Sequence, residues 1–506
     1  MKLKFLCQSA DILCPKESET VEIGSIVTDS RRAGNGCLFI CIRGTRTDGH
    51  KYIEQAVRNG CRAVLIEEGH AVDAPSNVTV LRTKSTRRAA AMLYNAWYGD
   101  PVSRLHIIGV TGTNGKTSVT YLLRAILESA GYRCGLIGTV GCESIGKRMD
   151  SRSDDPLANM TTPDPEVLYG LLAEMVRDGV EYVVMEVSSH ALALEKTAPM
   201  VFDVGIFTNL TAEHLDFHRT MESYAKAKAE LFAKSRISIL NHDSPYAPEM
   251  ERHAKGSVIR CSQKILADAC ASNVRFSENG VRYDLHFRED RVSIHSPIAG
   301  LFTVMNTMQA ALAARALGVD LESIRKALLT VRGIKGRMEP VVLDGAEFRV
   351  LIDYAHTPDA LKRLLQSAQR IKKPDGRVVL LFGCGGDRDR SKRGEMGRIA
   401  SLYADLVIVT SDNSRGEEPS SIIEEICAGI LPEREHQVIP DRREAIYSVV
   451  LNAKKDDLIL LAGKGHEEYE IIRDKKLPFS EREIVRAAFA ERAQQRSDAD
   501  AQETDQ

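Results

Sequence analysis

The sequence has no long apolar run and few aromatic residues. No stretch approaches the roughly 18 apolar residues that a membrane-spanning helix needs, and aromatic residues make up 6% of the 506 positions, with one tryptophan. The first residues, MKLKFLCQSADILCP, begin with basic charge but contain no sustained apolar stretch and no small-residue cleavage site. We therefore expect a cytoplasmic protein with no secretion signal and no membrane segment.

Neither sign of charge dominates, and the cysteines form no pattern. Lys and Arg number 68 against 70 Asp and Glu. A nucleic-acid motor or helicase needs a basic track with stacking aromatic residues, so the charge balance and the few aromatics argue against that class.

The eleven cysteines include no C-x-x-C pair. This is typical of reduced thiols that serve as small apolar residues, and it excludes a disulfide framework or a zinc site.

The length and the apolar pattern predict an α/β protein of three domains, because one core rarely serves more than roughly 250 to 300 residues. Residues 1–101 form a small α/β domain that ends at Gly99-Asp100-Pro101. In residues 102–335, strands and helices alternate as in a doubly wound, P-loop ATPase-like domain, and this alternation restarts in a Rossmann-like domain at 336–492. We expect the polar tail, 493–506, to be disordered.

The segment TGTNGKTS, residues 111–118, follows an apolar strand and precedes an amphipathic helix. Such a turn directs backbone N–H groups at an anion. Gly112 and Gly115 permit the turn, Lys116 can reach the β and γ phosphates, and the Thr117 hydroxyl can bind Mg²⁺. Val110 stands where G-x-x-x-x-G-K-[ST] has its first glycine, which indicates a variant phosphate loop. The alternative is an ordinary strand-turn-helix junction.

Three polar residues further along the chain are candidates for the same site. Glu186 ends a predicted buried strand, where a carboxylate needs a cation, although that cation could be a lysine. His214 follows the next strand, on the rim where α/β proteins bind ligands, but a lone histidine is as often structural. Lys226 and Lys228 lie on one predicted helix, and from the residues alone both would be solvated.

Motifs along nearly the whole chain resemble one family. They are TDSRRAGNGCLFICIRG, TTPDP, MEVSSHAL, FTNLTAEHLDFH, SYAKAKAELF, GRMEPV, IDYAHTPDAL, FGCGGDRDRSKR and AGKGHE, together with the phosphate loop. This set resembles the Mur ligase family, whose members join an amino acid to a UDP-muramoyl precursor of peptidoglycan, and the related folylpolyglutamate synthases. The N-terminal motif and the segments near residues 412 and 463 favour the peptidoglycan branch, and intact Lys116 and Glu186 argue against a non-catalytic nucleotide-binding protein.

The resemblance implies amide formation driven by ATP through an acyl phosphate. It implies four catalytic residues: Lys116, Glu186, His214 and Lys228. It also implies Mg²⁺ as cofactor, held by Thr117, Glu186, His214 and Lys228, with a carbamate formed on Lys228 by CO₂. His218 stays structural or orienting.

The resemblance also assigns substrate contacts. For ATP these are Thr111, Gly112, Thr113, Asn114, Gly115, Lys116, Thr117, Ser118, Asn306, Arg337 and Asp353. Asp353 could instead form an Asx turn before a helix, and the same residue can serve both as an ATP contact and in such a turn. For the uridine nucleotide of the UDP substrate they are Thr28, Ser30, Thr45, Arg46 and Thr47. For its muramoyl peptide they are Thr161, Thr162, Ser188 and Lys196. Lys196 stands where the family often has arginine, and Leu194 where it often has glutamine.

The incoming amino acid decides the branch of the family. The residues that match its contacts are Arg388, Asp412, Asn413, Ser414, Arg415, Gly463 and Glu467. An arginine fork suits the distal carboxylate of meso-diaminopimelate, which lysine lacks. We therefore predict addition of meso-diaminopimelate to UDP-MurNAc-L-Ala-D-Glu by a monomer that binds no nucleic acid. Because Ser414 replaces the usual proline, L-lysine remains an alternative as the incoming amino acid. A folylpolyglutamate synthase is a more distant alternative for the activity.

Overall fold

The computed structural model describes residues 1–44, 47–149, 160–264 and 266–504, with side chains as far as residue 495. Thr45 and Arg46, two of the predicted UDP contacts, lie outside the described residues. The chain divides into two compact units. The first comprises Met1–Gly112, Leu127–Leu210 and His214–Arg260, and the second Thr113–Ile126, Thr211–Glu213 and Cys261–Gln506.

The N-terminal part of the first unit contains a parallel sheet in the order β1-β2-β3-β4. Its elements are α1 (Leu3–Ser9), η1 (Lys16–Ser18), β1 (Ser25–Val27), η2 (Ser30–Arg32), β2 (Cys37–Ile40), η3 (Gly49–Tyr52), α2 (Ile53–Arg58), β3 (Ala63–Glu67), β4 (Thr79–Thr83), α3 (Thr86–Trp97) and η4 (Pro101–Arg104). Alternate residues of the strands are buried on opposite faces. Leu38 and Leu65 pack with α1 and α3, whereas Phe39 and Val64 pack with α2.

The central sheet begins with β5. In the first unit its strands follow the order β12-β11-β10-β5-β9-β6-β7-β8. The elements are β5 (His106–Thr111), β6 (Cys134–Gly138), β7 (Gly141–Ser144), β8 (Lys147–Arg148), α5 (Pro165–Asp178), β9 (Tyr182–Glu186), α6 (Ser189–Ala193), β10 (Phe202–Phe207), α7 (Leu215–His218), α8 (Met221–Ala229), η6 (Phe232–Lys234), β11 (Ser235–Asn241), α9 (Ala247–His253) and β12 (Ser257–Ser262).

The order of the central strands reverses at β5. β5 pairs in parallel with β9 on one side and with β10 on the other. After β5 the chain builds β6 and β9 on the first side and then β10 and β11 on the second. In such sheets ligands bind at the carboxyl ends of the strands beside the reversal. The phosphate loop leaves β5 at that end.

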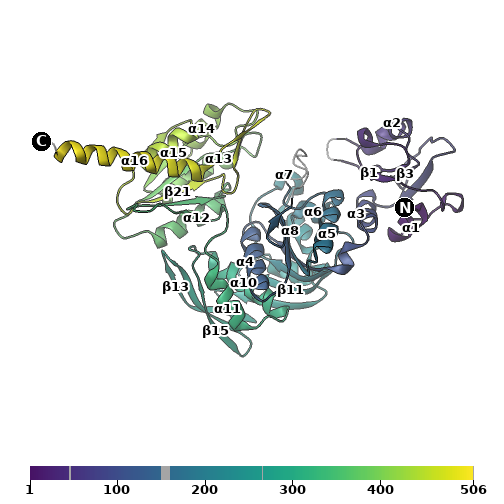
Figure 1. Ribbon diagram of the computed structural model, residues 1–506, viewed down its shortest axis with the longest axis horizontal. Coiled ribbons are helices and arrows are strands. Elements are labelled where there is room, and N and C mark those ends of the chain that lie inside the picture. Colours follow the sequence, from purple (N-terminus) through teal and green to yellow (C-terminus); the bar gives the residue numbers. More distant parts are fainter. Residues whose placement is uncertain (45–46, 150–159, 265, 505–506) are drawn as a thin grey trace. The chain divides into compact units, whose positions relative to one another are not determined.

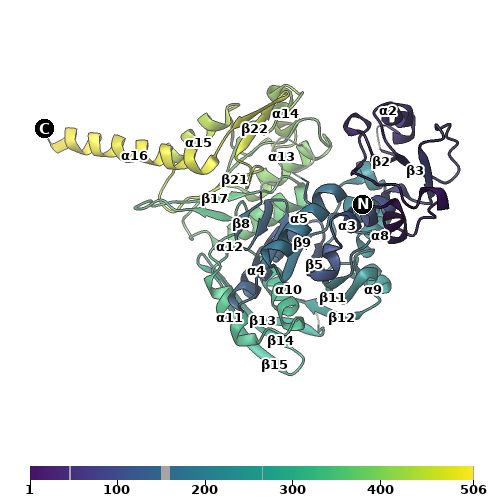
Figure 2. The same ribbon diagram turned by 45° about the vertical axis from the view of Figure 1, so that its right-hand side comes forward.

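The second unit begins with α4 (Lys116–Ser129), which extends three residues beyond the unit boundary, and continues with an antiparallel extension, β13-β14-β15. Its elements are β13 (Ala269–Ser277), β14 (Gly280–Phe287), β15 (Asp290–Ser296), α10 (Thr303–Ala316) and α11 (Leu321–Thr330). The three strands run side by side in Figure 2. The Tyr283 hydroxyl of β14 lies 2.9 Å from Thr307 Oγ1 of α10, so the helix packs on this extension.

The C-terminal sheet has the order β16-β17-β21-β18-β19-β20, parallel except for β16. Its elements are β16 (Glu339–Val341), β17 (Arg349–Asp353), α12 (Pro358–Ile371), β18 (Val378–Phe382), α13 (Lys392–Tyr403), β19 (Leu406–Val409), α14 (Pro419–Cys427), β20 (His436–Val438), α15 (Arg442–Leu451), β21 (Leu458–Ala462), β22 (Tyr469–Ile472), β23 (Lys475–Pro478) and α16 (Glu481–Thr504). Helices α12, α13 and α14 bury one face and α15 and α16 the other. Figure 1 shows this part of the chain in green to yellow.

These sheets confirm the predicted α/β class with doubly wound and Rossmann-like parts. The tail differs from expectation, because α16 continues to Thr504 through the alanines, glutamines and arginine that favour helix. All eleven cysteines are thiols, eight of them buried. Among the residues that the structure describes, no helix combines the length and the apolar content that crossing a membrane requires.

Candidate active site

Two glycines shape the loop between β5 and α4. Gly112 has φ 147° and Gly115 has φ 88°, conformations that disfavour any side chain. A Cβ on Gly112 would also collide with the Thr208 side chain and lie 3.0 Å from the Asn209 carbonyl oxygen. Thr111 is fully buried, and its carbonyl accepts a hydrogen bond from the Thr208 amide at 3.0 Å. The loop therefore reaches the helix start at Lys116 only with glycine at both positions.

Side chains within the second unit hold the rest of the loop. Thr113 Oγ1 accepts from the Thr211 amide at 3.0 Å and donates to the Thr211 carbonyl at 3.2 Å. Asn114 Nδ2 donates to Asp359 Oδ2 at 3.2 Å, and Lys116 Nζ donates to the Thr113 carbonyl at 2.9 Å. Lys116 is thus folded back on its own loop, where its charge sits beside the amides that would meet a phosphate.

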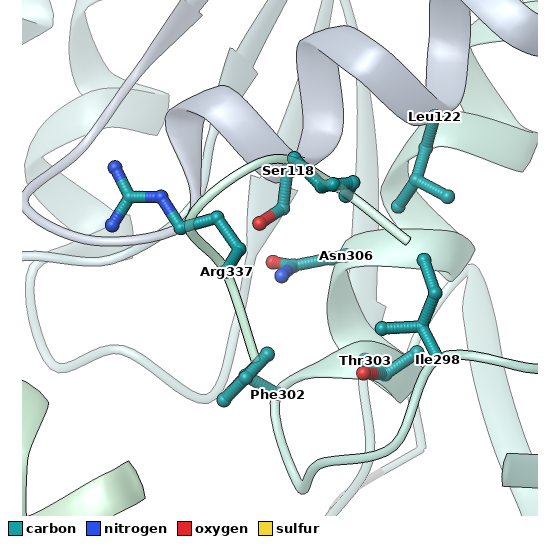
Figure 3. A pocket seen from close by; sticks show the side chains of 8 residues that line it. Ser118, Leu122, Ile298, Phe302, Thr303, Asn306 and Arg337 are labelled. Atoms are coloured by element: carbon teal, nitrogen blue, oxygen red, sulfur yellow. The ribbon is translucent and has the colours of Figure 1, made fainter. Parts of the chain in front are cut away.

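A pocket lies between α4 and α10 in the second unit (Figure 3). Its lining residues are Ser118, Leu122, Ile298, Phe302, Thr303, Asn306, Ile334 and Arg337. The Asn306 amide and the Ser118 hydroxyl point into it in Figure 3. Apolar walls with a few fixed polar groups are typical of a pocket for a flat heterocycle. Three predicted ATP contacts, Ser118, Asn306 and Arg337, are therefore brought together.

Arg337 lies between the loop helix and the third predicted domain. Its Nη2 donates to Thr117 Oγ1 at 3.2 Å, and its guanidinium lies 4.9 Å from the centre of the Tyr354 ring. Asp353, at the end of β17, accepts from the amides of Met338 at 2.7 Å and Ala355 at 2.9 Å. Burial raises the pKa of Asp353, against the opposing charge of Arg337.

The bond from Ala355 to Asp353 is an Asx turn, so that reading of Asp353 holds in the structure. The cap of α12 is a different residue, Thr357, whose hydroxyl accepts from the Ala360 amide at 3.3 Å. Asp353 is therefore not needed as the helix cap.

Glu186 ends β9 with 1% of its surface exposed. Thr139, at the end of β6, donates to it twice: the amide to Oε1 at 2.9 Å and the hydroxyl to Oε2 at 3.0 Å. A Cβ on Gly138 would lie 2.5 Å from Glu186 Oε1, so glycine is needed for this approach. Thr139 was not among the predicted site residues, because 47 residues separate it from Glu186 and no local pattern links them.

His214 belongs to a histidine cluster in the first unit. It is exposed, has φ 56°, and its ring lies 4.9 Å from that of His190. His218 Nε2 lies 2.8 Å from Ser189 Oγ, and the His218 and Tyr224 rings stack at 4.9 Å. Burial lowers the pKa of both His190 and His218 to about 4, so both are neutral near pH 7. His190 was not among the predicted site residues.

Lys228 and Lys226 have opposite surroundings on α8. Lys226 is exposed, whereas Lys228 is 1% exposed. Lys228 Nζ donates to the Gly112 carbonyl at 2.9 Å and lies 4.6 Å from the centre of the Tyr224 ring. The solvated reading is therefore wrong for Lys228, which points at the phosphate loop.

The four predicted muramoyl-peptide contacts, Thr161, Thr162, Ser188 and Lys196, lie near the end of β9. Thr162 Oγ1 donates to the Glu186 carbonyl at 2.9 Å and accepts from the Ser188 amide at 3.0 Å. Lys196, 6% exposed, forms an ion pair with Asp164 at 2.7 Å. Thr161 Oγ1 lies 2.9 Å from Thr139 Oγ1, next to the threonine that holds Glu186.

The described UDP contacts lie in the N-terminal part of the chain. Thr28 is exposed at the end of β1, and Ser30 donates to Gln55 Oε1 at 2.9 Å. Thr47 is exposed, with its hydroxyl 3.1 Å from that of Tyr52. Thr28 and Thr47 therefore offer hydroxyls at the surface, whereas Ser30 is buried.

The predicted amino-acid contacts gather at the carboxyl end of the C-terminal sheet. Asn413 Nδ2 donates to Glu467 Oε2 at 2.8 Å. Arg415, with φ 50°, donates to the Gly386 carbonyl at 2.9 Å and is half-buried. A Cβ on Gly463 would lie 2.6 Å from Asp412 Oδ2.

Two members of this set differ from the rest in exposure. Arg388 is exposed and donates to the carbonyl of Asp387 at 3.2 Å, whereas Ser414 is 2% exposed. Burial, and then the charge of Arg388, lower the pKa of Arg415. The two guanidinium groups therefore act on each other, while the carboxylates of Asp412 and Glu467 act on Arg415 in the opposite direction.

A variant phosphate loop at the strand reversal of a doubly wound sheet, together with a pocket against the helix that follows the loop, defines a nucleotide-binding α/β protein. Three family models match the chain: "Mur ligase family, catalytic domain" at residues 22–106, "Mur ligase middle domain" at 110–314 and "Mur ligase, glutamate ligase domain" at 336–465. The chain belongs to the Mur ligase family.

Similar proteins span almost the whole length. A UDP-N-acetylmuramoyl-L-alanyl-D-glutamate–2,6-diaminopimelate ligase of Caldanaerobacter subterraneus subsp. tengcongensis is 44% identical over 94% of this chain and 96% of its own. The enzyme of that name from Geobacillus kaustophilus is 40% identical over 93% and 96%. A solved structure of a ligase of the same name has a TM-score of 0.70 and 30% identity, and the match covers 97% of this chain and 100% of that one.

Proposed function

We propose that this chain is an ATP-dependent ligase that adds meso-diaminopimelate to the D-Glu γ-carboxylate of UDP-MurNAc-L-Ala-D-Glu, a step of peptidoglycan precursor synthesis. The observation that carries the proposal is the 44% identity, over nearly the full length, to a ligase named for these substrates. The carboxylate attacks the γ-phosphorus of ATP and ADP leaves. The amine then attacks the acyl phosphate and releases inorganic phosphate, with loss of a proton.

The first step crowds a triphosphate against a carboxylate. Like charges about 4 Å apart repel by roughly 4 kcal/mol at an effective dielectric of about 20. Lys116 supplies a cation at the phosphate loop, and Arg337, beside Thr117, supplies a second. We propose that the two cations neutralise the charge that builds up as the phosphoryl group transfers. The pocket of Ser118 and Asn306 would hold the adenine.

Mg²⁺ fits the donors of this chain. It prefers oxygen ligands, and Thr117 and Glu186, each 1% exposed, offer a hydroxyl and a carboxylate. We propose that His214 and a carbamate on Lys228 complete the ligand set. When bound, the ion would offset the negative charge of the phosphates. Thr139 would keep the Glu186 carboxylate oriented for this role through its two hydrogen bonds.

The incoming amino acid would lie at the carboxyl end of the C-terminal sheet. Arg415 and Arg388 suit its distal carboxylate, and Glu467 suits its ammonium. Lysine has no carboxylate at that end, so Arg415 would remain uncompensated in a lysine complex. This favours meso-diaminopimelate over the alternative, L-lysine. We further propose that the enzyme acts in the cytoplasm as a monomer.

Folylpolyglutamate synthase is the more distant alternative. A Mycobacterium tuberculosis folylpolyglutamate synthase in complex with ADP and AMPPCP has a TM-score of 0.60, but it is 20% identical and the match covers 75% of this chain. That likeness extends to the fold alone.

One assay tests the function. Purified enzyme receives ATP, Mg²⁺ and UDP-MurNAc-L-Ala-D-Glu, and phosphate release is compared with meso-diaminopimelate, with L-lysine and with no amine. We expect release with meso-diaminopimelate at least tenfold faster than with lysine, and none in Lys116→Ala. Arg415→Lys should reduce the preference for meso-diaminopimelate over L-lysine, because the point charge of an ammonium group replaces the paired N–H donors of a guanidinium group. Faster release with lysine would reverse the specificity, and no release with any amine would refute the function.

A further inference from the structure

Lys464 is a lysine without access to solvent, next to the predicted amino-acid contacts. Its exposed surface is 0%. Its Nζ donates to Asn413 Oδ1 at 3.1 Å and to the Tyr469 carbonyl at 3.1 Å, and lies 3.5 Å from Asp412 Oδ1. A buried ammonium is costly unless it is paired and hydrogen-bonded. These three contacts meet that requirement. Two of the partners, Asn413 and Asp412, are residues that we predict to contact the incoming amino acid.

The contact with Asn413 decides which way its amide faces. Asn413 Oδ1 accepts from Lys464 Nζ and from the Ile471 amide at 2.9 Å. With the oxygen fixed by two donors, Nδ2 must face Glu467 Oε2, 2.8 Å away. A flipped amide would place NH₂ against two donors and a carbonyl against a carboxylate. Lys464 thereby also orients Glu467 through Asn413.

The contact with Asp412 controls charge. Burial alone would raise the pKa of Asp412, but the charges of Lys464 and Arg442 outweigh it and lower that pKa. Glu467 lies in the field of Asp412, and its pKa is raised by burial and then by that carboxylate. Removal of the Lys464 ammonium would therefore leave the repulsion between the Asp412 and Glu467 carboxylates less compensated.

We propose that Lys464 is a positioning residue for the incoming amino acid: it fixes the Asn413 amide, and through it the Glu467 carboxylate, and it keeps Asp412 compensated. The inference rests on the proposed function, since it assumes that Glu467 and Asp412 meet the ammonium of the amino acid. Lys464 itself is buried and need not touch that substrate.

The test compares Lys464→Met with Lys476→Met. Methionine keeps a flexible chain and removes the charge. Lys476 is the matched control, because it is exposed on β23 and also contacts Tyr469, with its Nζ 3.9 Å from the centre of the Tyr469 ring. We expect the KM for meso-diaminopimelate to rise at least tenfold in Lys464→Met, with the KM for ATP within twofold. Lys476→Met should change both by less than twofold.

A second comparison separates positioning from general damage. If Lys464 acts through Asn413, its loss should matter less once that amide is gone. The KM increase in Lys464→Met combined with Asn413→Leu should therefore be smaller than the product of the two single increases. If Lys464→Met does not fold, Lys464→Gln, which retains an N–H donor, replaces it, with an expected KM increase of at least threefold.

The outcomes distinguish this inference from the function beneath it. Wild-type enzyme that releases no phosphate with any amino acid would remove the proposed function. Active wild-type enzyme with an unchanged KM in the lysine variant, equal increases for amino acid and ATP, or multiplicative effects with Asn413→Leu would remove only the role of Lys464.

Discussion

Lys228 shows what burial does to a single side chain. A lysine that is 1% exposed cannot rely on water and depends on partners within the protein. A neutral amine can attack CO₂, with loss of one proton, to give a carbamate. That step turns a cation into an anion with two oxygens. The exposed Lys226, on the same helix, has no such reason to react.

Lys228→Ala should lower the ligase rate at least a hundredfold, because it removes the carbamate that we propose as a Mg²⁺ ligand. Acetate or formate, which can occupy the vacated space as a carboxylate, should restore part of the rate. The measurement is phosphate release with and without the added anion, and Lys226→Ala should stay within twofold of wild type. Full activity in Lys228→Ala would contradict the carbamate.

At this scale the sequence located side chains better than it located their partners. Glu186 could be placed at a strand end because apolar runs mark strands, and Gly112 because a phosphate loop needs a glycine turn. The bonds from Thr139 to Glu186 and from Lys464 to Asn413 join residues 47 and 51 positions apart. Such pairs arise from the order of strands in the sheet, which local patterns do not specify.

Among the elements, α13 and α14 are joined by one buried cation. Arg393 of α13 is fully buried, donates twice to Glu417 at 2.9 and 3.0 Å, and donates to Glu425 of α14 at 2.9 Å. The hydrogen bonds from Arg393 are the main reason that the pKa of Glu417 falls to about 2. The loop before α14 is thereby tied to the start of α13, beside the 412–415 segment.

This ion cluster predicts an acid-dependent stability. Since the pKa of Glu417 is depressed from 4.5 to about 2 on folding, its stabilising contribution is present above about pH 4.5 and is lost as the pH falls toward 2. Glu417→Gln should therefore lower the midpoint of thermal unfolding at pH 7, by a margin that shrinks between pH 4.5 and 3. Thermal unfolding followed by circular dichroism at several pH values checks this. A difference that does not change with pH would contradict it.

The apolar strands of the C-terminal sheet followed from the sequence, and two short elements near the N-terminus did not. The strands β17, β18, β19 and β21 were expected because each is a run of apolar residues buried on both faces. β1 has three residues and α1 seven, too few for a period to be visible, and both were missed. Alanine, glutamine and arginine carry α16 beyond the point where polarity alone suggested disorder.

For the whole molecule, the predicted ATP contacts come from segments far apart in the chain. Lys116 starts α4, whereas Arg337 and Asp353 lie at the start of the third predicted domain. A complete ATP site therefore requires the third predicted domain to stay closed on the phosphate loop, as it is in the contacts of Arg337 with Thr117 and of Asp359 with Asn114. Closure would also exclude water from an acyl phosphate that hydrolyses readily.

Closure can be measured in solution. Addition of a non-hydrolysable ATP analogue with Mg²⁺ and UDP-MurNAc-L-Ala-D-Glu should reduce the radius of gyration in small-angle X-ray scattering. Lys116→Ala, which should bind the analogue weakly, is the control and should show a smaller change. An unchanged radius in the wild type at saturating ligand would contradict closure.

The three-domain division stays a prediction. It was based on turn-forming residues in the sequence, whereas the compact units are defined by the density of contacts in the structure. Gly99-Asp100-Pro101 marks a turn, and turns can be recognised locally. The two compact units instead separate at five places, after Gly112, Ile126, Leu210, Glu213 and Arg260, and the last boundary lies inside β12. Contacts accumulate wherever packing is dense, and no local pattern records that.

The buried thiols have a practical meaning for chemistry on this protein. Burial raises the pKa of Cys7, Cys41 and Cys384 to about 12, so the reactive thiolate is scarce at neutral pH. In the folded protein, alkylating reagents and peroxide should react slowly with the eight buried cysteines. They should react first with Cys14, Cys270 and Cys427, which are partly accessible. A probe attached under native conditions would thus report from three known positions.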